Sequence, residues 1–175
     1  MVRTRNCRGF SLAEILIVLG IMAVLATVVI LNFSGSDTKA KENALKANVA
    51  LLREAVDMYR SDHGWYPCDP DRDWNKKGKT ENFVYQLLGY TDVTGKPNKE
   101  RTDQYKYGPY LKKWPVEPFS SSGDIVIDMK TERPLYVLAE AIAKGKGTGG
   151  WYYEAKSGNV CANLGKGYPE EYANY

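Results

Sequence analysis

The sequence has little of the chemistry on which enzymes depend. It holds one histidine, His63, which lies beside Gly64 where a helix is predicted to end. Because a Ser/His/Asp or Cys/His catalytic site would have to include that single residue, hydrolytic activity is not expected. A C-terminal helix cap or a solvated position explains His63 more simply. The sequence therefore favours a protein that is not an enzyme.

The chain also lacks a broad basic surface and a phosphate-binding loop. Its formal charge of +3 equals the contribution of Arg3, Arg5 and Arg8, which lie in nine residues without an acid. Nucleic-acid binding needs a basic face or stripe, so no nucleic-acid partner is expected. The glycine-rich residues 143–150 lack the G-x-x-x-x-G-K-[ST] spacing, and they are predicted to form a flexible loop between two strands.

A complete calcium loop is missing as well. Asp69, Asp71 and Asp73 imitate its start, but Trp74 occupies the position that requires glycine, and Glu81 comes one residue late. An irregular oxygen site for calcium at the three aspartates stays open, beside a solvated loop of mixed charge. No cofactor is otherwise expected.

What the chain does have is one long apolar run near its N-terminus. Residues 10–31 hold a single charge, Glu14, and would measure about 33 Å as a helix, enough for a hydrocarbon core of about 30 Å. The arginines before the run predict a cytoplasmic N-terminus and a periplasmic or extracellular remainder. The run is too long for an ordinary signal peptide, although Ala23 and Ala26 leave cleavage there as an alternative. A lipoprotein signal fits poorly because Cys7 precedes the run.

The sequence R-G-F-S-L-A-E-I-L-I-V-L-G at residues 8–20 resembles the leader of type IV prepilins and type II secretion pseudopilins. The resemblance implies that a prepilin peptidase cuts between Gly9 and Phe10, and that the new terminal Phe10 is N-methylated. It also implies a role for Glu14 in subunit assembly. One departure is Leu31, where the family usually has proline.

The position of Glu14 has a physical rationale under this resemblance. A carboxylate near the centre of a bilayer costs about 2.5–3.5 kcal/mol on insertion scales. Cleavage after Gly9 would create an ammonium on Phe10, one helical turn away, and in a filament the amine of one subunit can meet Glu14 of its neighbour. The alternative is that Glu14 reaches the cytoplasmic headgroups and pairs with nothing.

Residues 34–64 are predicted to form an amphipathic helix that continues the apolar run as one stem. Its start can be capped by Ser36 or Asp37, it ends near His63, and Gly35 is its weak point. One face collects apolar side chains at spacings of three and four, namely Leu45, Val49, Leu52, Val56 and Tyr59.

Residues 65–175 are predicted to form a periplasmic head of α+β class. We expect a short helix at 81–90, an ordered loop at 91–123, and strands within 124–130, 134–142, 150–156 and 160–164. The strands would form a small antiparallel sheet packed on the amphipathic half of the stem, giving a pilin-like fold. Cys68 and Cys161 are a disulfide candidate because they are the two cysteines expected outside the cytoplasm, where disulfides form. The alternative is two buried thiols that lie too far apart to join.

Two further stretches, residues 50–67 and 108–119, look like the major pseudopilin of type II secretion systems. The resemblance implies a cleaved leader at 1–9, a transmembrane and filament-core helix at 10–33, the stem at 34–64 and the head at 65–175. Major pseudopilins often bind calcium near the C-terminus, but after Gly150 this chain has only three acids, so that site is not carried over.

The function implied is that of a structural subunit in a type II secretion pseudopilus at the inner membrane. Its partners would be other copies of itself, the prepilin peptidase, an inner-membrane assembly platform, minor pseudopilins and, before assembly, membrane lipid. A type IV pilin or minor pilin is the alternative within the family. A membrane-anchored binding or enzymatic head is the alternative from another class.

Overall fold

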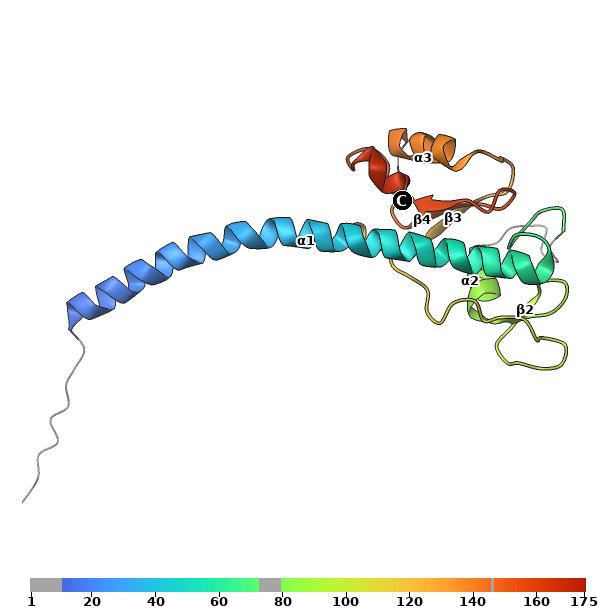
Figure 1. Ribbon diagram of the computed structural model, residues 1–175, viewed down its shortest axis with the longest axis horizontal. Helices are drawn as coiled ribbons and strands as arrows, with labels where there is room; N and C mark the ends of the chain where they lie inside the picture. The colour runs from blue at the N-terminus through green and yellow to red at the C-terminus, as the bar shows by residue number, and fades with distance from the viewer. Residues whose placement is uncertain (1–10, 73–79, 146) are drawn as a thin grey trace, which may run out of the picture. The chain divides into compact units, whose positions relative to one another are not determined.

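The computed structural model describes residues 11–72, 80–145 and 147–175, without the side chains of residues 27–36 and 80 (Figure 1). The chain divides into two compact units, Met1–Ala40 and Lys41–Tyr175. The elements in chain order are α1 (Leu12–His63), α2 (Thr80–Leu88), β1 (Tyr90–Thr91), β2 (Pro97–Asn98), β3 (Ile125–Asp128), α3 (Leu135–Lys144), β4 (Trp151–Glu154), β5 (Val160–Ala162) and the 3₁₀ helix η1 (Glu170–Ala173). The α+β class is confirmed.

Helix α1 confirms the predicted amphipathic stripe. Its five predicted apolar positions, from Leu45 to Tyr59, are at most 1% exposed. The helix ends where Gly64 adopts a φ of +83° and its N–H donates to the Arg60 carbonyl at 2.7 Å, a left-handed cap that suits glycine. The backbone stays helical through Gly35, so the predicted weak point does not interrupt it.

A membrane span was predicted at residues 10–33. Within the part of the chain that the structure describes, no helix has a stretch both long and apolar enough to cross a bilayer. The predicted span begins at Phe10, which lies outside the described residues, and it stays a prediction.

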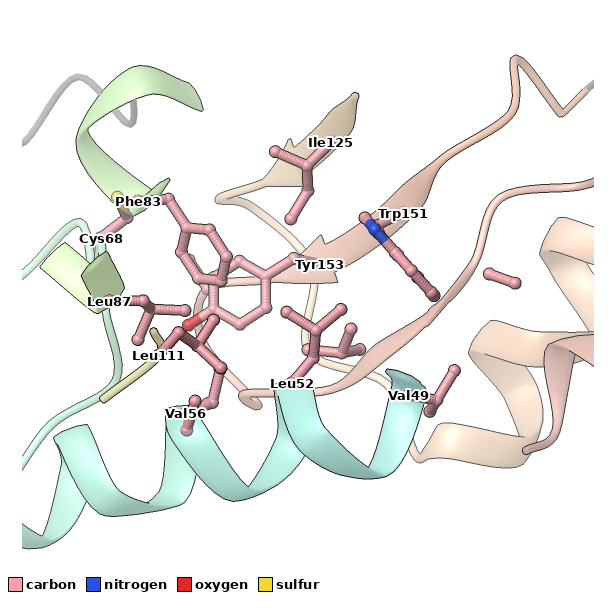
Figure 2. Close-up of a cluster of buried hydrophobic side chains, with 14 of the residues drawn as sticks. Val49, Leu52, Val56, Cys68, Phe83, Leu87, Leu111, Ile125, Trp151 and Tyr153 are labelled. Atoms are coloured by element: carbon pink, nitrogen blue, oxygen red, sulfur yellow. The ribbon is translucent and has the colours of Figure 1, made fainter. Parts of the chain in front are cut away.

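The core of the second unit lies between α1, α2 and the three-stranded sheet (Figure 2). Leu52 and Val56 of α1 face Phe83 of α2 and Tyr153 of β4, and the rings of Phe83 and Tyr153 lie 4.2 Å apart. The hydroxyl of the buried Tyr153 is satisfied, because it donates to the Pro67 carbonyl at 2.8 Å. This packing fixes the sheet on the stem, because fully burying each large apolar side chain contributes about 1.5–3 kcal/mol.

The sheet differs from the predicted antiparallel arrangement in one pair of strands. Strands β4 and β5 are antiparallel, but β3 and β4 are parallel, with Asp128 opposite Glu154. The reason is that residues 134–142, predicted as a strand, form most of helix α3. A helix between β3 and β4 is the crossover that a parallel pair requires.

The glycine-rich residues 143–150 also differ from expectation. They connect α3 to β4, and the Gly149 N–H donates to the Asn163 carbonyl at 2.9 Å. A Cβ at Gly147 would lie 2.2 Å from the Leu164 carbonyl carbon, so the backbones approach closely where only glycine fits. The connection is therefore packed against residues 163–165, and the predicted flexible loop between two strands is wrong.

Candidate functional site

The first turn of α1 holds Glu14 in a reciprocal pair with Ser11. The Ser11 N–H donates to Glu14 Oε2 at 2.9 Å, and the Glu14 N–H donates to Ser11 Oγ at 3.2 Å. This is a capping box, which satisfies helix N-terminal donors and places a negative charge at the positive end of the helix dipole. The pattern S-x-x-E before an apolar run is the sequence signal for a capping box, and the role of Ser11 was not predicted.

The helix that follows Glu14 is apolar on every side. The large apolar side chains among residues 12–25 are between 49% and 79% exposed. A helix that is hydrophobic all round needs a membrane or other helices to cover it. The capped Glu14 thus lies at the start of an apolar surface that is stable only when lipid or other helices cover it. The predicted cleavage and methylation residues, Gly9 and Phe10, lie outside the described residues.

The structure does not join Cys68 to Cys161, and both thiols are buried. Cys68 belongs to the core between α1 and the sheet, and its Sγ lies 3.3 Å from Gln86 Oε1. In β5, Val160 and Ala162 face that core, so the alternation of a strand turns Cys161 to the other face. Burial raises the pKa of the Cys161 thiol to about 12. The alternative of two buried, unjoined thiols describes this structure.

Two of the three aspartates at which an irregular calcium site stayed open form a local turn. Asp69 Oδ1 accepts the N–H of Asp71 at 2.9 Å, and Asp73 lies outside the described residues. Among the residues that the structure describes, no group of three or more His, Cys, Asp or Glu side chains is placed to hold a metal ion. The turn explains Asp69 without a ligand.

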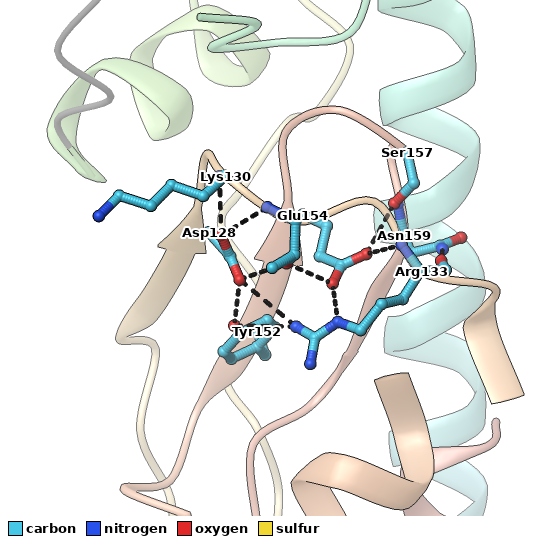
Figure 3. Close-up of polar contacts among 8 residues, drawn as sticks. Asp128, Lys130, Arg133, Tyr152, Glu154, Ser157 and Asn159 are labelled. Atoms are coloured by element: carbon cyan, nitrogen blue, oxygen red, sulfur yellow. Dashed lines mark hydrogen bonds and ion pairs between the residues drawn. The ribbon is translucent and has the colours of Figure 1, made fainter. Parts of the chain in front are cut away.

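A partly buried charge cluster at the ends of β3 and β4 was not predicted (Figure 3). Glu154 is fully buried, and Arg133 Nε donates to its Oε1 at 2.5 Å, while Arg133 Nη2 lies 3.4 Å from Asp128 Oδ2. Burial acts to raise the pKa of Asp128, but hydrogen bonds from Thr131, Lys130 and Tyr152 hold it at about 2. Arg133 thus bridges two carboxylates that the parallel register brings together, with one positive charge beside two acids.

His63 is buried at the end of α1, so the solvated alternative is wrong. Its Nε2 lies 2.9 Å from Thr91 Oγ1, and its ring centroid is 4.2 Å from that of Tyr59. Nδ1 has no hydrogen-bond partner among the described residues. Burial lowers the pKa of His63, against the opposing influence of Asp62 and Asp92. His63 is therefore packed into the head.

The C-terminal segment is held to the start of the second unit. The Tyr175 hydroxyl donates to Glu42 Oε1 at 2.6 Å, and Lys46 Nζ lies 4.2 Å from the centre of the Tyr175 ring. Arg53 donates to the carbonyl of Tyr175 and also to that of Val160. These contacts fix the position of Tyr175 along α1, between Glu42 and Arg53.

Comparisons with known proteins point to one family. The prokaryotic N-terminal methylation motif matches residues 4–30. A type II secretion system core protein G of Escherichia coli (strain K12) is 39% identical over 146 residues, which cover 83% of this chain and 88% of that protein. The protein of the same name from Vibrio cholerae serotype O1 is 26% identical, with 85% and 92% covered. That of Klebsiella pneumoniae is 30% identical, with 65% and 70% covered. No solved structure matches the chain.

Proposed function

Because the chain belongs to the family of type II secretion system core protein G, we propose that it is a structural subunit that polymerises into a secretion pseudopilus. The observation that carries this proposal is the relationship to the Escherichia coli protein over most of both chains. The proposed role is non-enzymatic, and the exposed apolar helix at residues 12–25 supports it, because such a surface suits a packed bundle of helices.

The proposed maturation route begins at the inner membrane. Residues 10–33 would span the bilayer with the N-terminus in the cytoplasm and the head in the periplasm, as the three leader arginines favour. The prepilin peptidase would cut between Gly9 and Phe10, and Phe10 would be methylated. The methylation motif match at residues 4–30 supports this route. The subunit would then leave the lipid through an inner-membrane assembly platform and join other copies and minor pseudopilins.

In the proposed filament, Glu14 has a local and an intermolecular role. Its hydrogen bond from the Ser11 N–H reduces the cost of a carboxylate in an apolar setting until a neighbour arrives. The amine of Phe10 on an adjacent subunit would then supply the opposite charge, and the low dielectric would strengthen the attraction.

Deletion of the gene tests the proposed function. We expect exoprotein secretion to stop while surface fibres persist, and we expect secretion to return when the full chain is expressed. The methylation motif is shared with type IV prepilins, so the opposite pattern, loss of surface fibres with normal secretion, would support a type IV pilin instead.

Mass spectrometry of the purified protein tests the maturation route. The expected N-terminus is a methylated Phe10, and a variant with Gly9→Val should instead keep its leader and begin at Met1. A wild-type protein that begins at Met1, or after Ala26, would contradict the route.

A further inference from the structure

Helix α1 carries a second apolar stripe that the fold of the head leaves uncovered. Leu51 is 42% exposed and Met58 is 49% exposed, although both lie on the part of α1 that packs in the head. Together with Ala55 and Leu111, they line a groove of about 450 Å³ between α1 and residues 110–113. Ala55 and Leu111 are buried at 1% and 4% exposure, and the groove is therefore apolar at its base.

The rim of this groove is mainly basic. Lys112 and Lys113 line it, both side chains are exposed, and neither forms an ion pair within the described ranges. Glu54 is the one acid on the rim, on the α1 side. An occupant that fits would place an aromatic or prolyl group over Leu51 and Met58 and two carboxylates beside the lysines.

The chain itself presents such a segment at residues 168–171. The sequence is Tyr-Pro-Glu-Glu, Tyr168 is 38% exposed, and the three residues after it are exposed as well. Glu170 and Glu171 form no ion pair with other residues that the structure describes. The phenol of Tyr168 supplies a donor for Glu54, and the two glutamates supply the charges opposite to Lys112 and Lys113.

The groove and the acidic segment cannot meet within one copy. Tyr175 holds the C-terminal segment against Glu42, Lys46 and Arg53, whereas the groove lies between α1 and residues 110–113. In Figure 1 the C-terminal segment and the yellow loop of residues 97–113 lie on opposite sides of α1.

We propose that the groove between α1 and residues 110–113 receives residues 168–171 of a second copy of this chain. The inference rests on the proposed pseudopilus function and names a head-to-head contact for it. The contact joins two different surfaces, so each copy keeps one groove and one acidic segment for the next neighbour. With parallel α1 helices, such a contact repeats from copy to copy and builds an open filament when the rotation does not close a ring.

Charge reversal with rescue tests the contact in cells that carry the secretion machinery. Fibre yield should fall about tenfold with Lys112→Glu plus Lys113→Glu, and equally with Glu170→Lys plus Glu171→Lys. Combining all four substitutions should restore the yield to within about twofold, because the attraction is re-formed with the signs exchanged. Lys130→Glu plus Lys156→Glu is the control for the lysine pair, since it changes the net charge by the same amount at exposed positions away from the groove.

A cysteine pair supplies a second measurement that does not depend on charge. With Lys112→Cys and Glu171→Cys in one full-length chain, oxidation of the fibres should give a ladder of dimers, trimers and longer species. Either substitution alone should give no ladder, and native Cys68 and Cys161 are buried. Melting of each variant in detergent should match that of the wild type, which excludes misfolding as the cause.

The outcomes separate this contact from the proposed function. The contact would be overturned by a normal fibre yield in both charge-reversal variants, or by cross-linked dimers without longer species. It would also be overturned if the variant with all four substitutions did not regain its fibre yield, because that result would indicate a different occupant of the groove. If the wild-type chain itself forms no fibres and supports no secretion, the proposed function fails and the contact fails with it.

Discussion

His63 is a buried imidazole whose ionisation opposes folding. Burial lowers its pKa below the ordinary value of about 6.5, and the facing carboxylates Asp62 and Asp92 offset this only in part. Below pH 6.5, His63 therefore becomes protonated in the unfolded chain while it stays neutral in the folded chain until the pH reaches its lowered pKa. The contribution of His63 to stability is complete above that pH and declines as the pH falls toward the lowered pKa.

We expect the free energy of unfolding to be smaller at pH 5.5 than at pH 7.5 and the difference to shrink in His63→Gln. Glutamine can keep a hydrogen bond to Thr91 without titrating, so the variant isolates the imidazole. Urea denaturation of the full chain in detergent at the two pH values measures the effect. An equal pH dependence in both proteins would show that other groups cause it.

The two thiols give a second prediction at the scale of residues. Because Cys68 and Cys161 are buried on different faces of the sheet, alkylation of the purified, non-reduced protein should modify neither in the folded state. Both should react after denaturation without a reductant. A mass corresponding to a peptide pair joined through Cys68 and Cys161 would contradict the structure.

At the scale of elements, one face of α1 packs in the core and another lines the groove, and the adjacent residues Leu52 and Leu51 lie on these two faces. Leu52 is fully buried in the core, so Leu52→Ala should lower the free energy of unfolding by about 2–5 kcal/mol. Leu51 lies in the exposed groove, and Leu51→Ala should change stability by less than about 0.5 kcal/mol. Chemical denaturation of the two variants is the measurement, and similar losses would contradict the assigned faces.

The polar cluster between β3 and β4 should depend strongly on Arg133. Arg133→Met leaves Glu154 buried without its cation and should cost about 3–5 kcal/mol. Adding Glu154→Gln to that variant should recover part of the loss, since the amide carries no charge. Lys144→Met, which removes an exposed ion pair with Glu140, is the control and should have no measurable effect on the same denaturation curve.

Sequence patterns predicted the elements whose periodicity is long. The stripe from Leu45 to Tyr59 repeats over four turns, and all its members are buried as expected. The run P-L-Y-V-L-A-E-A-I is short and almost continuously apolar, and such a run fits a buried strand as well as a helix. Pro134 at the N-terminus of α3 and the Glu140–Lys144 pair were the helical signals that this interpretation underweighted.

The candidate site residues likewise divide into those that a local sequence pattern reveals and those that depend on strand pairing. Glu14 was noticed because a lone charge in an apolar run is anomalous, whereas the arrangement of Asp128, Arg133 and Glu154 depends on which strands pair and in what register. Whether Cys161 points to the same face of the sheet as Cys68 likewise depends on the alternation of side chains along β5. Tertiary pairings of this kind are not encoded in a local pattern, so one sequence could not supply them.

At the scale of the whole molecule, the chain separates an apolar assembly surface from a folded head of nearly balanced charge. The exposed apolar residues 12–25 precede a second unit with its own core, so a change in one need not disturb the other. Assembly variants near Glu14 should therefore leave the stability of the head unchanged. Comparison of their melting curves with the wild type in detergent provides the check.

The most direct test is the fibre yield of Glu14→Gln, with Glu14→Leu beside it. Glutamine can replace glutamate in the capping box with Ser11, so it retains the start of α1 and removes only the negative charge. If Glu14 accepts the amine of a neighbouring Phe10, both variants should remain membrane-bound with processed N-termini and assemble at least about tenfold fewer fibres than the wild type. Fibres of wild-type abundance from Glu14→Gln would contradict this account.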